Sequence, residues 1–378
     1  MRAFVFTDSS LARHAGQFVW LAINREKAQN SAFCRRYPVV GIPAFFVLDP
    51  SGRTVRLNWL GGLTVGELHT LLDDVRDHRN TPPALLAKLA AADSLYGASD
   101  WTGASRAYRA VLAAAPPDWR GYPRVVESLQ TAMSTGGDDA GALALARETL
   151  QRLGRSPSAL NVAAGGLGAA TSLPDSVPGR VAALAEMAAA THALVTDTSF
   201  ATAADDRSGA YIALIDARDA VHDSAGVRQV AGEWSAFLDG QAERAKTPEE
   251  RAVFDSHRLS AYLQLGEPEK AVPMLLQSEH DMPGDYNPPA RLAIAYKAMK
   301  RWDDALAASD RAMALAYGPR KLLLYDTRVD IERGRGDLTG ARRTLAEEIA
   351  YARALPEEQR SPARLAALQK KLDALPAN

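Results

Sequence analysis

Residues 261–271 read AYLQLGEPEKA and residues 295–305 read AYKAMKRWDDA, and the match between these two stretches decides the fold. Each stretch contains a tyrosine, then a turn, then an alanine: Tyr262 and Ala271 in the first, Tyr296 and Ala305 in the second. The tyrosines are 34 residues apart (296 − 262), and so are the alanines (305 − 271). A period of this length predicts a stack of helical hairpins, in which the small side chain lets two helices approach and the aromatic one fills the groove beside it.

Weaker copies of this pattern lie on both sides. Ala341 follows Ala305 by 36 residues (341 − 305), and Ala104 with Tyr108 repeats the pattern near residue 100. Ala142 is a poorer match, and residues 156–250 are helical in composition without a clear period. The pattern resembles that of the tetratricopeptide repeat family. The resemblance implies an all-α solenoid over residues 84–376, with protein or peptide clients bound in its groove.

The first eighty or so residues have a different pattern, in which strand formers alternate with helical segments. Residues 39–52 read VVGIPAFFVLDPSG, which predicts an apolar strand over residues 44–48 and a tight turn at residues 49–52. A buried strand is also predicted over residues 17–24, a helix over residues 25–37 and a half-exposed strand over residues 53–60. Thr64 and Glu67 have the spacing of a capping box that begins a further helix.

This order of elements, together with residues 39–52, resembles the second half of a thioredoxin fold. The resemblance implies an α/β domain over residues 1–80 and a cis peptide bond between Ile42 and Pro43, in a loop that contacts substrate in the family. It also implies that residues 1–7 end a helix, and that the first strand and a Cys-x-x-Cys pair lie upstream of Met1.

An incomplete sheet is therefore expected. Loss of a central strand of about five residues would remove on the order of 10 kcal/mol of apolar burial. Three explanations stay open: the coding sequence starts upstream of Met1, the chain is a truncation, or a decayed domain is supported by the helical part.

The chain has one cysteine, Cys34, so a two-cysteine redox cycle is impossible within a single copy. Arg35 and Arg36 would make an exposed thiol at this position more reactive. A buried, inert side chain is the commoner case for an unpaired cysteine, and it is the interpretation that we favour. An exposed Cys34 could still form an intermolecular disulfide.

No residues point to a metal or a cofactor, and we predict neither. The seven histidines include no pair at metal-ligand spacing, and residues 279–281 (EHD) are interpreted as a solvated helix end. Residues 164–169 (AGGLGA) lack the lysine and hydroxyl of a phosphate loop and predict close helix packing instead. Four tryptophans are expected in the core between helices: Trp101, Trp119, Trp234 and Trp302.

Composition limits the partners. The formal net charge of −1 gives no electrostatic footprint for nucleic acid, and no apolar run reaches the ~18–20 residues that span a bilayer. The first eight residues lack the pattern of a secretion signal. As written, the chain is expected to be cytoplasmic; with an upstream start and a signal peptide it would be extracytoplasmic (periplasmic).

Two functions follow from these patterns. The first is a protein-binding scaffold whose thioredoxin-like part has, as written, no two-cysteine redox activity. The alternative is a thiol–disulfide oxidoreductase in redox homeostasis, with its Cys-x-x-Cys upstream of Met1. A hydrolase or transferase within residues 156–250 is a weaker hypothesis, because no catalytic constellation supports it.

Overall fold

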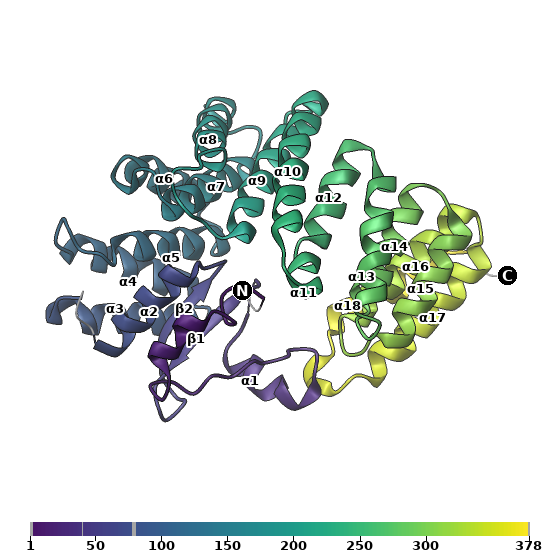
Figure 1. Ribbon diagram of the computed structural model, residues 1–378, viewed down its shortest axis with the longest axis horizontal. Coiled ribbons are helices and arrows are strands. Elements are labelled where there is room, and N and C mark those ends of the chain that lie inside the picture. The colour runs from purple at the N-terminus through teal and green to yellow at the C-terminus, as the bar shows by residue number, and fades with distance from the viewer. Residues whose placement is uncertain (1–2, 40, 78–80, 377–378) are drawn as a thin grey trace. The chain divides into compact units, whose positions relative to one another are not determined.

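The computed structural model describes residues 3–39, 41–77 and 81–376, and most of them are helical (Figure 1). The chain forms two compact units. Unit 1 consists of Met1–Phe18 and Tyr37–Val230, and unit 2 consists of Val19–Arg36 and Ala231–Asn378. This division differs from the predicted domains, residues 1–80 and 84–376, because the N-terminal region contributes to both units.

The N-terminal part of unit 1 is a small module of one hairpin and one helix. Strand β1 (Ala44–Leu48) pairs antiparallel with β2 (Val55–Leu60), and Ala44 lies opposite Leu60. The predicted turn joins them, with the Gly52 N–H donating to the Asp49 carbonyl at 2.8 Å. Helix α2 (Val65–Asp77) follows, and the short helix η1 (Ser9–His14) precedes the hairpin in sequence.

Helix α2 begins at the predicted capping box. The Glu67 carboxylate accepts hydrogen bonds from the Thr64 N–H and hydroxyl at 2.8 and 2.7 Å, and the Glu67 N–H donates to the Thr64 hydroxyl at 3.2 Å. The core of the module combines the buried faces of β2 and α2. Strand β2 is more buried than its alternating pattern predicted: even the polar Asn58 is buried, with only 7% of its surface exposed. The buried core residues are Val5, Val47, Leu57, Trp59, Leu63, Leu68, Leu71 and Leu72.

Three local predictions for the N-terminal region are wrong. Residues 17–24 form no strand, since the sheet in the described part of the chain contains β1 and β2 alone, and Val19 and Leu21 are 89% and 73% exposed. Residues 3–7 are turns rather than the end of a helix. The helix predicted over residues 25–37 is reduced to η2 (Ala28–Asn30) and α1 (Ser31–Arg36). A strand forms only where a neighbouring backbone takes its hydrogen bonds, and residues 17–24 have no such neighbour.

The rest of unit 1 is a stack of antiparallel helices. Helix α7 contacts both α5 and α9 as well as its sequence neighbours, so these three helices form the inner layer of the stack. We call them the inner helices of unit 1. The bounds are α3 (Pro83–Gly97), α4 (Trp101–Ala114), α5 (Tyr122–Thr135), α6 (Asp139–Leu153), α7 (Pro157–Ser172), α8 (Arg180–Val195) and α9 (Ala204–Asp219). Helix α10 (Ser224–Arg244) runs across the boundary between the units.

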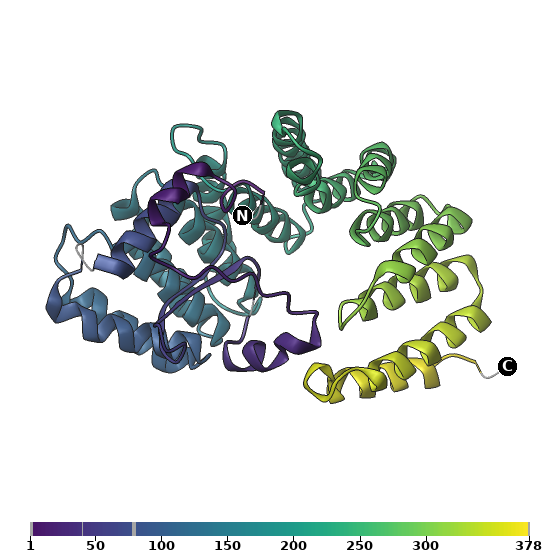
Figure 2. The same ribbon diagram turned by 60° about the horizontal axis from the view of Figure 1, so that its bottom comes forward.

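Unit 2 is built in the same way, and Figure 2 shows its helices, coloured green to yellow, as successive antiparallel pairs. Its inner helices are α12 (Asp255–Leu265), α14 (Asn287–Ala298) and α16 (Lys321–Arg335), since α14 contacts both of the others. The remaining bounds are α11 (Pro248–Ala252), η3 (Pro268–Lys270), α13 (Ala271–Asp281), α15 (Trp302–Leu315), α17 (Leu338–Ala354), η4 (Glu357–Gln359) and α18 (Pro362–Asp373).

Six of the helix-to-helix turns share one geometry. In each, a backbone N–H bonds the carbonyl five residues earlier at 2.8–3.0 Å, and the residue before the donor has a positive φ. The six positive-φ residues are Ser99, Gly137, His222, Gly266, Lys300 and Gly336. Five residues further on lies a buried side chain that is small in five of the six: Ala104, Ala142, Val227, Ala271, Ala305 and Ala341. This is the hairpin expected from the tetratricopeptide pattern, and it includes one repeat that the sequence did not reveal, because Val227 stands at the alanine position.

The predicted packing residues lie in these hairpins. All five alanines are 0% exposed, and the tyrosines beside the turns are buried: Tyr108, Tyr262 and Tyr296. Gly166 on α7 also confirms the close packing predicted for residues 164–169, since an added Cβ would lie 2.6 Å from the Ala146 Cβ. Trp119 and Trp234 are buried as predicted, whereas Trp101 and Trp302 are half-buried.

Enlarging one of these alanines should loosen unit 2. We expect Ala305→Leu to destabilise the hairpin of α14 and α15 by about 1–3 kcal/mol, because the added atoms must displace packed neighbours. Ala307→Leu is the control, since Ala307 is exposed on the same helix. Urea unfolding of both variants measures the difference; equal midpoints would contradict a tight contact at Ala305.

Candidate functional site

The predicted site residues lie in different units. The Ile42–Pro43 bond is cis, and Ile42 is 66% exposed at the start of the hairpin in unit 1. The Gly61 N–H donates to the Pro43 carbonyl at 3.0 Å, which ties this loop to the end of β2. Cys34 is on α1 in unit 2 and is partly exposed rather than buried. No common site is therefore assigned to Cys34 and the cis-proline loop.

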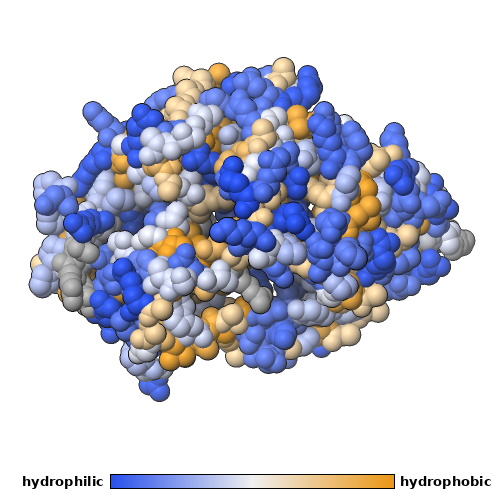
Figure 3. All heavy atoms as spheres, in the orientation of Figure 1, coloured by the Kyte–Doolittle hydropathy of each residue, from blue (hydrophilic) through white to orange (hydrophobic). Residues whose placement is uncertain are grey.

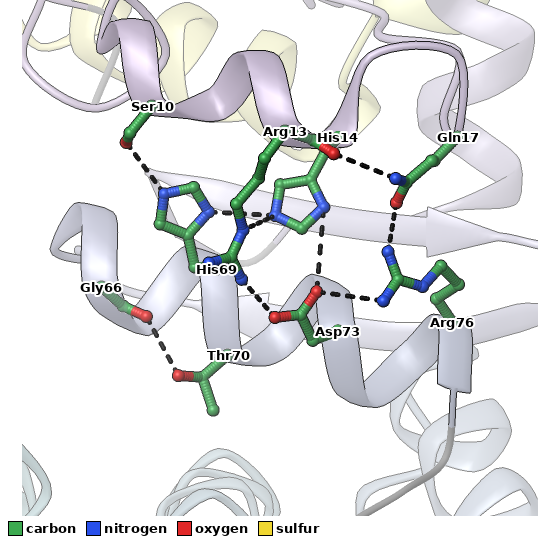
Figure 4. A network of polar contacts seen from close by, with 9 residues as sticks. All are labelled: Ser10, Arg13, His14, Gln17, Gly66, His69, Thr70, Asp73 and Arg76. Atoms are coloured by element: carbon green, nitrogen blue, oxygen red, sulfur yellow. Dashed lines mark hydrogen bonds and ion pairs between the residues drawn. The ribbon is translucent and has the colours of Figure 1, made fainter.

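A histidine pair that the sequence did not reveal joins η1 to α2 (Figure 4). His14 Nε2 lies 2.9 Å from His69 Nδ1, and His69 Nε2 lies 2.9 Å from the Ser10 hydroxyl. Asp73 Oδ1 is 3.9 Å from His14 Nδ1, and Asp73 also forms ion pairs with Arg13 and Arg76. His14 is 1% exposed, and burial lowers the pKa of His69, with the charges of Arg13 and His14 acting in the same direction.

Two hydrogen-bond directions in this network are fixed by groups that can play one role only. Arg13 Nε can only donate, so it donates to His14 Nε2 at 3.2 Å. The Asp8 carboxylate can only accept, so the Ser10 hydroxyl donates to it at 2.6 Å, and the same carboxylate caps η1.

This network resembles a nucleophile with its base, but the Ser10 proton is directed to Asp8 rather than to His69. It fixes η1 against α2. Its members are 55 residues apart (69 − 14), which is why spacing alone could not predict it. The described residues also contain no group of three or more side chains that could hold a metal ion.

The loop after β2 rests on the inner helices of unit 1. The Gly62 N–H donates to Asp206 Oδ1 on α9 at 2.7 Å. Asn161 on α7 donates to the Glu127 carboxylate on α5 at 2.9 Å and to the other oxygen of Asp206 at 3.3 Å. One amide thus bridges two carboxylates on neighbouring inner helices, and one of these carboxylates holds the backbone of the module.

Both carboxylates are hard to ionise. Burial raises the pKa of Glu127 to about 7, and hydrogen bonds from Ser158 and Asn161 offset it only in part. Burial raises the pKa of Asp206 to about 6, against the hydrogen bonds from Gly62 and Asn161. Each acid raises the pKa of its neighbours further, since like charges in a desolvated site disfavour a second ionisation.

The contact at Gly62 leaves no room for a side chain. A Cβ there would lie 2.6 Å from the Ala203 Cβ and 2.9 Å from Asp206 Oδ1. We expect Gly62→Ala to weaken docking of the module by about 1–3 kcal/mol, seen as faster hydrogen exchange in β2 and α2. Gly66→Ala is the control, because a Cβ there meets nothing within 4 Å, and alanine favours the helix. Equal exchange in the two variants would argue against the contact.

Unit 2 also holds a non-repeat segment, residues 24–36. Asn24 donates to the Tyr317 hydroxyl at 3.0 Å, and the Arg320 N–H donates to the Glu26 carboxylate at 2.8 Å. Gln359 donates to the Glu26 carbonyl at 3.2 Å. An added Cβ at Gly318 would lie 2.5 Å from that same carbonyl, so the two backbones are in close contact. The segment is held through the side chains of Asn24 and Glu26 and through the Glu26 carbonyl.

The surface offers no dominant apolar patch on the face drawn in Figure 3, where hydrophilic side chains prevail and apolar ones form small groups. Among the large apolar side chains whose exposure the structure describes, Val19 is the most exposed, and Leu21 is also largely exposed. No helix among the described residues is long and apolar enough to cross a membrane.

Comparison with known proteins adds one likeness. No family model matches the chain, and no curated protein matches it. Among solved structures, a tetratricopeptide repeat protein from Parabacteroides merdae is similar, with 12% identity, a TM-score of 0.47, and coverage of 77% of this chain and 98% of that one. The assignment of a helical-repeat architecture rests on the six matching turns and the buried alanines of this chain.

Proposed function

We propose that this protein is a helical-repeat scaffold that binds extended protein segments and, in the chain as given, carries out no two-cysteine redox chemistry. One observation supports the proposal most directly: each unit already holds a non-repeat segment of its own chain. In unit 1 the segment is the loop at Gly62, and in unit 2 it is residues 24–36.

Two of these contacts use the segment's own backbone, the Gly62 N–H and the Glu26 carbonyl, and do not depend on the side chain that the segment carries. A carboxylate that accepts a backbone N–H, or an amide that donates to a backbone carbonyl, recognises any extended segment that fits. The inner helices of unit 2 offer one large exposed apolar side chain among their described residues, Leu323 on α16, which is 53% exposed. A client segment that packs on α16 would cover it.

Site-specific photo-crosslinking in the native host tests the scaffold. A photoreactive amino acid is placed at Leu323 in the full chain, and Leu338, which is 42% exposed on α17, is the control position. We expect discrete protein partners, crosslinked through extended segments, at position 323 and background at position 338. Background at both positions, or the same products at both, would count against a client-binding inner layer.

We further propose that the hairpin and α2 are the remaining part of a thioredoxin-like domain. The order of β1, β2 and α2 after a cis-proline supports this proposal. The alternative function is thiol–disulfide exchange by a Cys-x-x-Cys upstream of Met1.

The intact mass and N-terminal sequence of the native protein separate the two functions. If the protein begins at Met1, we expect no insulin reduction by the chain, and Cys34→Ser should leave client binding unchanged. A native protein that extends through a Cys-x-x-Cys and reduces insulin would replace the scaffold proposal with the oxidoreductase, and would also place the protein outside the cytoplasm if a signal peptide is present.

A further inference from the structure

Strand β1 is the outer strand of the hairpin in unit 1. Strand β2 pairs with it on one side and also packs on α3, and no further strand of the described chain lies on the other side of β1. We call this other side of β1 the free edge. An unpaired edge presents a row of N–H and C=O groups to which another strand can bond.

The hydrogen bonds of the hairpin show which backbone groups lie on the free edge. The Gly61 N–H donates to the Pro43 carbonyl, and in an antiparallel pair the residues that bond the partner alternate with residues that do not. The register places Ala44 and Phe46 at positions that do not bond β2. Their N–H and C=O groups point away from β2 and have no hydrogen-bond partner among the described residues. The free edge can therefore accept a further strand.

The chain also contains a segment with the composition of a strand and no strand beside it. Residues 19–23 (VWLAI) lie outside every helix, turn and strand, and all five are exposed. Val19 and Leu21 are 89% and 73% exposed, and neither forms a hydrogen bond with any described residue. β-Branched and aromatic side chains such as these favour a strand once a neighbouring backbone is present.

We propose that residues 19–23 of one copy of this chain add to the free edge of β1 in a second copy, so that two chains exchange strands in a dimer. The two segments are each five residues long and neither contains a charged side chain, so the pairing desolvates no charge. In a parallel alignment, Arg25 of one copy comes beside Asp49 of the other, and Arg25 forms no ion pair with a described residue. Because each copy has both the segment and the edge, the same contact forms twice about a two-fold axis and closes the assembly.

Hydrogen exchange resolved at single residues tests this pairing in the full chain. When the protein concentration rises from about 1 to about 100 μM, we expect exchange of the Ala44 and Phe46 amides to slow by at least about tenfold, because the added strand takes their hydrogen bonds. Phe45 and Val47 are the matched controls, since their amides already face β2 and should not respond to concentration. Sedimentation over the same range should show monomer converting to dimer.

Two proline variants block one side of the contact each. Leu21→Pro removes a donor from the exposed segment and should raise the dissociation constant of the dimer by at least about tenfold. Its control is Ala201→Pro, in an exposed stretch before α9, which should leave the dimer unchanged. Ala44→Pro removes an N–H from the free edge without removing a bond to β2, and slow exchange of the Phe45 amide reports that its hairpin is intact.

Mixing the two variants identifies the partners. Each variant alone should stay monomeric, whereas the mixture should form heterodimers, because the free edge of Leu21→Pro accepts the intact segment of Ala44→Pro. Dimerisation of Ala44→Pro by itself would show that residues 19–23 pair with one another and would overturn the proposal. So would a wild-type chain that stays monomeric, assemblies larger than a dimer, a Leu21→Pro dimer as tight as the wild type, or concentration-independent exchange at Ala44 and Phe46.

Discussion

Arg124→Met is expected to destabilise the first helices of unit 1 by about 3–5 kcal/mol, the largest single effect predicted for this chain. The substitution keeps most of the apolar volume of the side chain but removes the cation beside Asp93. Asp93 is 1% exposed, and its oxygen at the centre of the contact accepts from both Arg124 and Tyr108. A buried carboxylate that loses its cation is left uncompensated, and this costs more than an intact pair contributes.

The direction of the pKa shifts agrees with a coupled buried group. Burial alone would lower the pKa of Arg124, yet the pKa is raised, because Asp93 stabilises the charged guanidinium. Burial raises the pKa of Tyr108 well above its usual range, and the negative charge of Asp93 adds to the effect. The tyrosine therefore stays a neutral donor to Asp93 over the whole physiological range of pH.

Hydrogen exchange of α3 and α5 in the full chain measures the loss locally, which is needed because a chain of two units does not unfold in a single step. The control is Arg147→Met, since Arg147 pairs with Glu186 at the surface and such pairs contribute about 0–1 kcal/mol. Adding Asp93→Asn to Arg124→Met should recover much of the loss. If Arg124→Met destabilises these helices no more than Arg147→Met does, the buried pair of Arg124 and Asp93 does not stabilise them as its geometry indicates.

Sequence reasoning worked where a single local rule determines the structure. The alanines at 271 and 305 predicted the hairpins because only a small side chain fits where two helices touch, and Thr64 with Glu67 predicted the start of α2 because a helix must satisfy its first N–H groups. The repeat at α9 and α10 was missed because Val227 fills the alanine position while the turn before it keeps the same hydrogen bond.

Sequence reasoning failed where the local structure depends on residues that are far away in the sequence. Residues 17–24 have the composition of a buried strand, but strand formation needs a neighbouring backbone, and Val19 is instead 89% exposed. The His14–His69 contact and the bridge from Glu127 to Asp206 join residues far apart in sequence, so no spacing rule could indicate them. The hydrogen bond from the Gly62 N–H to Asp206 could not be predicted for the same reason.

That bridge predicts the second large effect, a fall in the stability of the inner layer of unit 1 as the pH rises from about 4 to about 7. In the unfolded chain Glu127 and Asp206 ionise near 4.5 and 3.8, whereas in the folded chain their pKa values are raised to about 7 and about 6. Between these limits the folded chain binds more protons than the unfolded one, so the free energy of unfolding decreases with rising pH and levels off above about 7.

The size of this fall follows from the difference in the pKa of Glu127 between the unfolded and the folded chain. A pKa raised from 4.5 to about 7 lowers the free energy of unfolding at pH 8 by on the order of 3 kcal/mol. The negative charges of Glu67 and Asp205 also raise the pKa of Asp206, and Asp206 raises that of Glu127, so the separate contributions of Glu127 and Asp206 do not simply add. Glu127→Gln fixes this position in its neutral form and should raise the stability at pH 8 while flattening the pH dependence.

Hydrogen exchange of α5, α7 and α9 at pH 5 and pH 8, corrected for the intrinsic effect of pH on exchange, tests this expectation. Glu148→Gln is the matched control, because Glu148 is exposed on α6. If Glu127→Gln protects the inner helices at pH 8 and Glu148→Gln does not, the buried acids limit the stability of this layer at neutral pH. The hydrogen bond from the Gly62 N–H favours the ionised form of Asp206, so this contact should persist at pH 8 and the loss of protection should be confined to the inner helices. Equal pH dependence in the two variants would instead mean that the folded protein hydrates both carboxylates.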